Sequence, residues 1–266
     1  MHDLYDIPAH LADARIAGEA ERILDDSRAH GLRGVLVNAA RLREWPVVAE
    51  LATQPGVCGA LGLHPFFLAE WGDSVPDRLR EAFRQAGTPP PECGLRAVGE
   101  IGLDLWQCKD RTAALDRQIP AFEAQLAVAC ELRLPVILHN RKAWPEFFAI
   151  WKRIAAGKID GVCHHFTGAP EILREALDLG LHVSFCGPIT YENSRRIHEV
   201  AKLAPLNRIL TETDAPDLPA APWRGLRSEP WHVSAVITEL ARIKGVSKEE
   251  IASAVAANYR RILRLP

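Results

Sequence analysis

Short apolar runs typical of buried strands recur along the chain, and segments with helical periodicity separate them. The expected strands are 4–7, 34–38, 57–63, 97–103, 135–139, 161–166, 182–186 and 208–213. Parallel strands that are connected by helices are buried on both faces, which explains why these runs are nearly continuous in apolar residues. Eight such alternations predict an α/β chain folded as a (β/α)₈ barrel, the TIM barrel. An open, doubly wound sheet is the alternative, because alternation alone does not close a barrel.

Two helices can be predicted in more detail. Residues 111–133 carry apolar residues at steps of three and four, but Pro120 interrupts this segment and marks either a kink or the true start of the helix. Near the C-terminus, Ser247 and Glu250 have the spacing of a capping box, which predicts a helix that begins just after Ser247.

Length and composition are those of an ordinary globular protein. The chain has 266 residues, of which 48% are hydrophobic and 25% are charged. An α/β barrel commonly reaches this length as one unit, so we expect a single domain over 1–266. The main compositional break is GTPPPECG at 87–94, whose consecutive prolines predict a stiff surface loop rather than a domain linker.

The sequence indicates where the protein is located, but its net charge does not identify its partner. No apolar run approaches the roughly 20 residues of a membrane span, and no secretory signal is visible. Six cysteines without a CxxC pair favour reduced thiols in a cytoplasmic protein. A net charge of −2 excludes a uniformly basic surface, although a local basic rim could still bind phosphates.

Polar residues that can bind a metal ion fall repeatedly at the ends of the expected strands. In a barrel these ends converge on one mouth, so residues distant in sequence become neighbours. An ionised Glu100 inside AVGEIGL would be costly to bury unless it is paired or coordinated. Histidines and carboxylates together suit a divalent ion, and a carboxylate can bridge two ions that polarise a phosphoryl oxygen and activate a water. The residues in question are His10, His64, Glu100, Asp104, His139, His164 and Asp214.

A purely structural interpretation is possible for His64, which belongs to this set, and for His165, which is adjacent to it. His64 precedes a proline in GLHP and could simply shape a turn. His165 follows His164 directly, so in an extended strand its side chain would point to the opposite face, which favours packing over chemistry.

The same stretches resemble the successive signature motifs of the TatD family of metal-dependent deoxyribonucleases. The resemblance implies a TIM barrel with a two-metal hydrolase site that acts on DNA from its 3′ end. It runs nearly end to end and comprises GLHP (62–65), AVGEIGLDLW (97–106), LPVILHNRKAW (134–144), GVCHHFTG (161–168), TETDAP (211–216) and the late SEPWHV…NYRRIL (228–263).

The resemblance also implies roles for single residues. By position, Glu100 is similar to the family's metal-bridging carboxylate, and His139 and His164 are similar to the ligands of one ion. Asp214 is similar to the acidic ligand that also handles the attacking water, and His64 to the histidine near the scissile phosphate. Catalysis is thus expected from Asp214, Glu100 and His64. Up to two divalent ions are expected, with Mg²⁺ favoured and Mn²⁺ or Zn²⁺ as alternatives. Arg141 matches a nearby basic group, and Asp104 matches an aspartate whose role stays open.

The N-terminal motif departs from the family pattern. The family usually begins with a strand that ends in His-x-His, and DIPAHL at 6–11 matches it with His10 as the second histidine and Pro8 in place of the first. Proline offers no ligand atom, so one metal position is expected to lack a ligand. Asp6 lies on the same side of the strand but deeper, and we do not expect it to substitute.

Three functions follow from these patterns. The first is a metal-dependent phosphodiesterase, a 3′–5′ exodeoxyribonuclease acting on single-stranded DNA, monomeric and not bound to a membrane. The second is a catalytically weakened barrel that binds or regulates, which only Pro8 favours. The third is a related metal-dependent amide or ester hydrolase. Arg141, Arg224 and Arg227, in loops that also carry tryptophans, suit a nucleic-acid strand, although scattered surface arginines are common.

Overall fold

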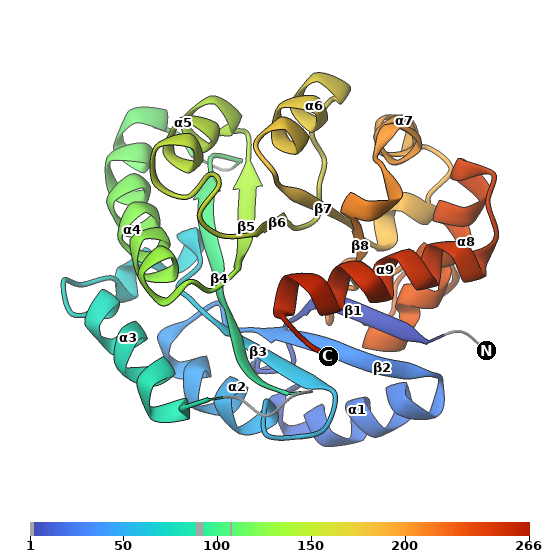
Figure 1. Cartoon of the computed structure of the whole chain (residues 1–266), viewed down its shortest axis with the longest axis horizontal. Coiled ribbons are helices and arrows are strands. Elements are labelled where there is room, and N and C mark those ends of the chain that lie inside the picture. The colour runs from blue at the N-terminus through green and yellow to red at the C-terminus, as the bar shows by residue number, and fades with distance from the viewer. Residues whose placement is uncertain (1–2, 89–92, 107) are drawn as a thin grey trace.

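The computed structural model describes residues 3–88, 93–106 and 108–266, so residues 89–92, half of the expected 87–94 loop, lie outside the described residues. Within the described residues, an eight-stranded parallel sheet runs in strict chain order from β1 to β8 (Figure 1). The strands are β1 (Leu4–Ala9), β2 (Leu32–Asn38), β3 (Val57–Leu61), β4 (Gly94–Asp104), β5 (Val136–Arg141), β6 (Gly161–Cys163), β7 (His182–Phe185) and β8 (Ile209–Thr211).

The first and last strands come together and nearly close this sheet into a barrel. The hydroxyl of Thr211 in β8 donates to the carbonyl of Tyr5 in β1 over 2.9 Å. Just beyond β8, the Asp214 amide donates to the Pro8 carbonyl (3.1 Å), and the His10 amide donates to the Ala215 carbonyl (2.8 Å). These contacts join the two edges that an open sheet would leave apart. The predicted TIM barrel is therefore confirmed, and the open-sheet alternative is wrong.

Helices alternate with the strands and pack around them (Figure 1). None of the helices within the described residues has the length and apolarity of a membrane span. The helices are α1 (Ala20–Ala29), α2 (Trp45–Leu51), α3 (Val75–Ala86), α4 (Arg111–Leu132), α5 (Trp144–Ile154), α6 (Pro170–Asp178), α7 (Arg195–Leu203), α8 (Val233–Lys244) and α9 (Lys248–Leu263).

Helix α4 excludes one of the two alternatives for Pro120, that this residue marks the start of the helix. The helix begins at Arg111, where the side chain of Asp110 caps it by accepting a hydrogen bond from the Ala113 amide (3.1 Å). Pro120 lies inside the helix. The apolar periodicity over 111–133 was thus the stronger signal, and the N-cap lay one residue before it.

Helix α9 closes the N-terminal end of the barrel. It begins after Ser247, whose hydroxyl accepts from the Glu250 amide (3.1 Å), so the predicted cap is confirmed. The helix lies against β1 and β8 (Figure 1, red), and Nδ2 of its residue Asn258 donates to the carbonyls of Leu206 and Ile209, each over 2.8 Å. The opposite end, where the strands finish, is the mouth of the barrel.

Candidate metal centre

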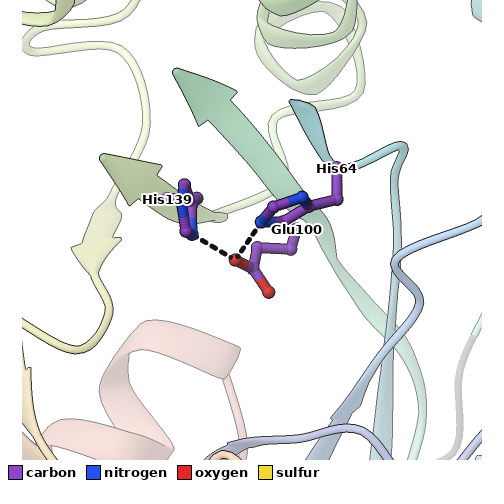
Figure 2. A group of neighbouring side chains, drawn as sticks. All are labelled: His64, Glu100 and His139. Carbon is purple, nitrogen blue, oxygen red and sulfur yellow. Dashed lines mark hydrogen bonds and ion pairs between the residues drawn. The ribbon is translucent and has the colours of Figure 1, made fainter. Parts of the chain in front are cut away.

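Glu100 lies at the centre of the mouth, surrounded by four histidines. Its side chain is only 2% exposed. Oε1 is 2.7 Å from Nε2 of His164, 2.8 Å from Nδ1 of His139 and 3.3 Å from Nε2 of His64. Oε2 is 3.0 Å from Nε2 of His10. Figure 2 shows His64, just after β3, and His139, in β5, approaching the same carboxylate oxygen. Residues that are far apart in the sequence therefore converge on one carboxylate.

The strands that carry these side chains pack very closely. A Cβ added to Gly102 of β4 would lie 1.8 Å from the carbonyl oxygen of His139 in β5. Only glycine at this position lets β4 approach β5 so closely. Gly102 thereby brings His139 within reach of Glu100.

Asp104, whose role the sequence left open, holds His139 in place. Its Oδ2 is 2.8 Å from Nε2 of His139, on the side of the ring away from Glu100. Its Oδ1 accepts a hydrogen bond from the Trp106 amide (2.7 Å). A carboxylate bonded to the second nitrogen of a ligating histidine fixes the orientation of the ring and raises its basicity.

His10 and Asp214 form the other half of the cluster. Nε2 of His10 is 3.2 Å from Oδ1 of Asp214. Apart from this ion pair, the buried Oδ1 has no hydrogen-bond partner within the part of the chain that the structure describes. Asp214 has a left-handed backbone (φ 55°), a conformation that costs free energy in most residues but that aspartate tolerates better. Among the described residues, this carboxylate oxygen at the mouth is thus held by the ion pair with His10 alone.

Glu212 is a buried carboxylate that the sequence interpretation missed. It accepts hydrogen bonds from the His165 amide (2.6 Å) and from the Ser184 hydroxyl, and its Oε1 lies 3.7 Å from Nδ1 of His164. A signal was available, because in an extended TETD segment Glu212 and Asp214 fall on the same side of the chain.

His165 does not point away from the mouth as the sequence suggested. Strand β6 ends at Cys163, so His164 follows the strand instead of lying within it, and His165 has a left-handed backbone (φ 42°). The alternation of an extended strand therefore no longer applies, and His165 lines the same cavity as His164. The expectation of packing on the opposite face is wrong for this reason.

The cavity at the mouth has a volume of about 360 Å³. Two residues predicted to bind substrate do not line it. Arg227 is paired with Glu19 (2.9 Å) and Glu229 (3.2 Å), and the Arg224 guanidinium lies over the Tyr191 ring at 4.7 Å. The other predicted site residues do line it, namely His10, His64, Glu100, His139, Arg141, His164 and Asp214.

The charges at the mouth are those of a ligand set. Burial raises the pKa of Glu100, but the surrounding histidines outweigh it and hold this pKa well below its ordinary value, so Glu100 is ionised. Burial lowers the pKa of His64 to about 4, which leaves its ring neutral at pH 7. Burial likewise raises the pKa of Asp214, yet the adjacent His10 brings it down to about 2. The mouth therefore offers anionic carboxylates to a cation, and the neutral His64 ring adds no positive charge beside them.

This donor set fits a divalent metal ion better than it fits a hydrogen-bond network. Three imidazole nitrogens crowd one carboxylate oxygen, and Nδ1 of His139 also faces Nε2 of His164 at 3.1 Å. A carboxylate oxygen cannot accept three good hydrogen bonds in such a space, whereas nitrogen and oxygen donors that converge are what a divalent ion requires. Donor atoms of His64, Glu100 and His139 all lie within 4.8 Å of one another.

The position of Pro8 supplies no ligand to this centre. Asp6, the nearest residue on the same side of β1, is fully occupied elsewhere: its carboxylate accepts from the amide (2.7 Å) and the hydroxyl (2.5 Å) of Thr213. The side of the centre near His10 and Asp214 therefore lacks the additional ligand from β1 that the family pattern would place at position 8.

Comparison with known proteins gives a consistent result. The family model described as "TatD related DNase" matches residues 5–264. The chain is 32% identical to the uncharacterized metal-dependent hydrolase YabD of Bacillus subtilis, over 98% of this chain and 99% of that protein. It is also 32% identical to the 3′-5′ ssDNA/RNA exonuclease TatD of Pantoea vagans, over 98% and 100% of the two chains. The crystal structure of the TatD homologue YjjV of Escherichia coli K12 superposes with a TM-score of 0.89 at 28% identity, covering 99% of this chain and 98% of that one.

Proposed function

Because this chain belongs to the TatD-related DNase family and is a metal-dependent hydrolase, we propose that it removes nucleotides from the 3′ end of single-stranded DNA. The observation that carries the proposal is the convergence of four histidines and Asp214 around the buried Glu100 at the barrel mouth. The name of the Pantoea vagans relative, a 3′-5′ ssDNA/RNA exonuclease, supports the substrate and the direction.

The residues divide into two groups of ligands that share Glu100. His139 and His164 with Glu100 would hold one ion, and His10 and Asp214 with Glu100 would hold the other. Divalent ions at such a site polarise the phosphoryl oxygen and lower the pKa of a bound water. Mg²⁺ is the ion we expect, since it accepts water in place of a missing protein ligand.

His64 has a different role in this proposal. Its Nδ1 accepts a hydrogen bond from the Phe66 amide (3.0 Å), so the neutral ring carries its proton on Nε2. That nitrogen is a donor and not a metal ligand in this tautomer. His64 therefore donates a hydrogen bond to a phosphate oxygen at the mouth. Oδ1 of Asp214, which has no partner among the described residues besides its ion pair with His10, accepts a proton from the attacking water.

The test uses a single-stranded oligonucleotide labelled at its 5′ end, incubated with the purified protein in EDTA, Mg²⁺ or Mn²⁺. We expect a ladder of shortened labelled products with metal and none in EDTA. With a second oligonucleotide labelled at its 3′ end, the first labelled product should be a mononucleotide. Glu100→Gln, which keeps the side-chain size, is the matched inactive control. Labelled fragments from internal cuts, or no cleavage with any metal, would contradict the proposal.

Pro8 favours a second function, that of a barrel which binds nucleic acid but cleaves it poorly. The residue has no ligand atom, and its carbonyl is used to hold the Asp214 amide. Tight DNA binding by a fully metal-loaded protein without turnover would support this second function over the first.

We also propose that the enzyme is cytoplasmic and monomeric. Fractionation of the source cells and sedimentation of the purified chain test these two points.

A further inference from the structure

Two exposed aromatic rings stand next to the metal centre. Among the described residues, four large hydrophobic side chains are strongly exposed, and the two aromatic ones are Phe66 (54%) and Trp106 (51%). Phe66 follows β3 and Trp106 follows β4, so both occupy the mouth. Exposing an aromatic ring to water is unfavourable, and rings gathered at a site indicate a ligand with a flat apolar face.

Other aromatic residues in the mouth loops are already packed. Trp144 lies 5.2 Å from the ring of Phe166, and Trp223 stacks on His232 at 3.7 Å. Phe67, the neighbour of Phe66, is covered by the guanidinium of Arg41 at 3.7 Å. These three rings are partly buried, whereas Phe66 and Trp106 remain exposed.

Phe66 is the closer of the two rings to the reacting groups. It lines the cavity, and its ring centroid is 4.7 Å from that of His64 and 6.0 Å from that of His139. The hydrogen bond from its amide to Nδ1 of His64 fixes its backbone. A flat group held against this ring would lie beside the phosphate that His64 contacts.

Trp106 lies slightly further out, among cations. The Arg141 guanidinium is 4.6 Å and the Lys142 ammonium 4.2 Å from its ring, and Arg141 also lines the cavity. The bond from the Trp106 amide to Asp104 ties the ring's backbone to the residue that orients His139. An indole beside two cations is suited to a ligand that alternates flat rings with negative charges, as a single strand of nucleic acid does.

We infer that Phe66 and Trp106 bind the substrate by stacking on its bases, an inference that rests on the proposed function. Phe66 stacks on the base next to the reacting phosphodiester, and Trp106 stacks on a base further along the strand. Arg141 and Lys142 neutralise the phosphates between them. Because every base has a π face, this arrangement accepts any sequence but requires unpaired bases.

The experiment compares two fluorescent single strands that differ only in their bases. One is an oligothymidylate, and in the other tetrahydrofuran abasic residues replace the four nucleotides at the 3′ end. Binding is measured by anisotropy in EDTA, where no cleavage occurs. For the intact strand, Phe66→Ala and Trp106→Ala should each raise Kd by roughly 5- to 150-fold, the range of base–aromatic stacking. For the abasic strand, neither variant should change Kd.

Leu226→Ala is the matched control, because Leu226 is 66% exposed and does not line the cavity. It should leave both affinities unchanged, and the conservative variants Phe66→Tyr and Trp106→Phe should retain the wild-type preference for intact bases. An equal loss on both strands, or no loss on either, would overturn the stacking roles. Failure of the proposed function would look different: the base-dependent binding in EDTA would persist, but Mg²⁺ or Mn²⁺ would give no cleavage.

Discussion

At the N-terminal end of the barrel, Asn258 of α9 donates from Nδ2 to the carbonyls of Leu206 and Ile209, whereas at the mouth four histidines crowd the single carboxylate of Glu100. The first arrangement pairs each amide hydrogen with a dedicated acceptor. The second has more donor atoms than one carboxylate can accommodate, and among the described residues it leaves Oδ1 of Asp214 with only its ion pair to His10. A polar group buried with its partner contributes to stability, whereas a surplus of ligand atoms indicates binding.

The largest effect should come from the centre of the mouth. Glu100→Gln removes the charge that both proposed metal positions share, so kcat/KM on single-stranded DNA should fall by about 1000-fold or more. The fold should persist in EDTA, as circular dichroism measures, because the glutamine keeps the size of the side chain. Cleavage by this variant at the wild-type rate would show that Glu100 is not the shared metal ligand.

Pro8→His should supply the ligand that the His10 and Asp214 half of the same centre lacks. The new side chain would lie on the same side of β1 as His10 and should tighten the metal near Asp214 by about 10- to 100-fold, the size of effect seen when groups around a metal are changed. Calorimetric titration with Mn²⁺ measures this directly. Pro8→Ala, which removes the proline without adding a ligand, is the control.

The gain in cleavage from Pro8→His should fade at saturating metal, because the expected defect is occupancy and not the chemical step. Equal metal affinity in both proteins would mean that another group or a water already fills the place.

A change at the other end of the barrel should separate stability from chemistry. Asn258→Ala leaves two carbonyls without their donor and should lower the free energy of unfolding by about 2 kcal/mol. Cleavage at saturating metal and below the unfolding range should equal that of the wild type. Urea denaturation and a parallel nuclease assay measure the two quantities, with the exposed Lys248→Ala as the control on the same helix. A loss of metal affinity in Asn258→Ala without a loss of stability would contradict the assignment of stability to this end of the barrel and of metal binding to the mouth.

The smallest effect is expected on the rim. Each phosphate contact on a single strand contributes about 0.7 to the slope of log affinity against log salt concentration. Arg227 is held by Glu19 and Glu229, so Arg224→Ala combined with Arg227→Ala should reduce this slope by no more than about one contact. Arg141→Ala, at the cavity itself, should reduce it at least as much. If the double variant reduces the slope by the equivalent of two or more phosphate contacts, the DNA path lies over α8 and its preceding loop.

The fold could be predicted from the sequence because its signals are local and repeated. Apolar runs and helical periodicity are properties of short segments, and eight of them in alternation leave few architectures. The errors arose where a backbone turn replaced regular structure. Strand β6 is short, and the left-handed backbone at His165 redirects a side chain that strand alternation would have turned away.

The site was predictable to the extent that its residues end strands. His139 and Asp214 could be assigned to the mouth because barrel topology brings all strand ends together. The function of Asp104 could not be inferred, because its contact with Nε2 of His139 depends on how two neighbouring strands pack. The ion pairs of Arg227 were hidden for the same reason: Glu19 is distant in sequence, and charge alone does not reveal which arginines are already paired.

The central claim is that the strand ends around Glu100 form a divalent metal centre. The most direct test is a crystal of the protein soaked in Mn²⁺, with diffraction data collected at the manganese absorption edge. We expect an anomalous peak in contact with Glu100, His139 and His164, and a weaker peak or none beside His10 and Asp214, where Pro8 offers no ligand. The absence of any anomalous peak in contact with Glu100 would contradict the account.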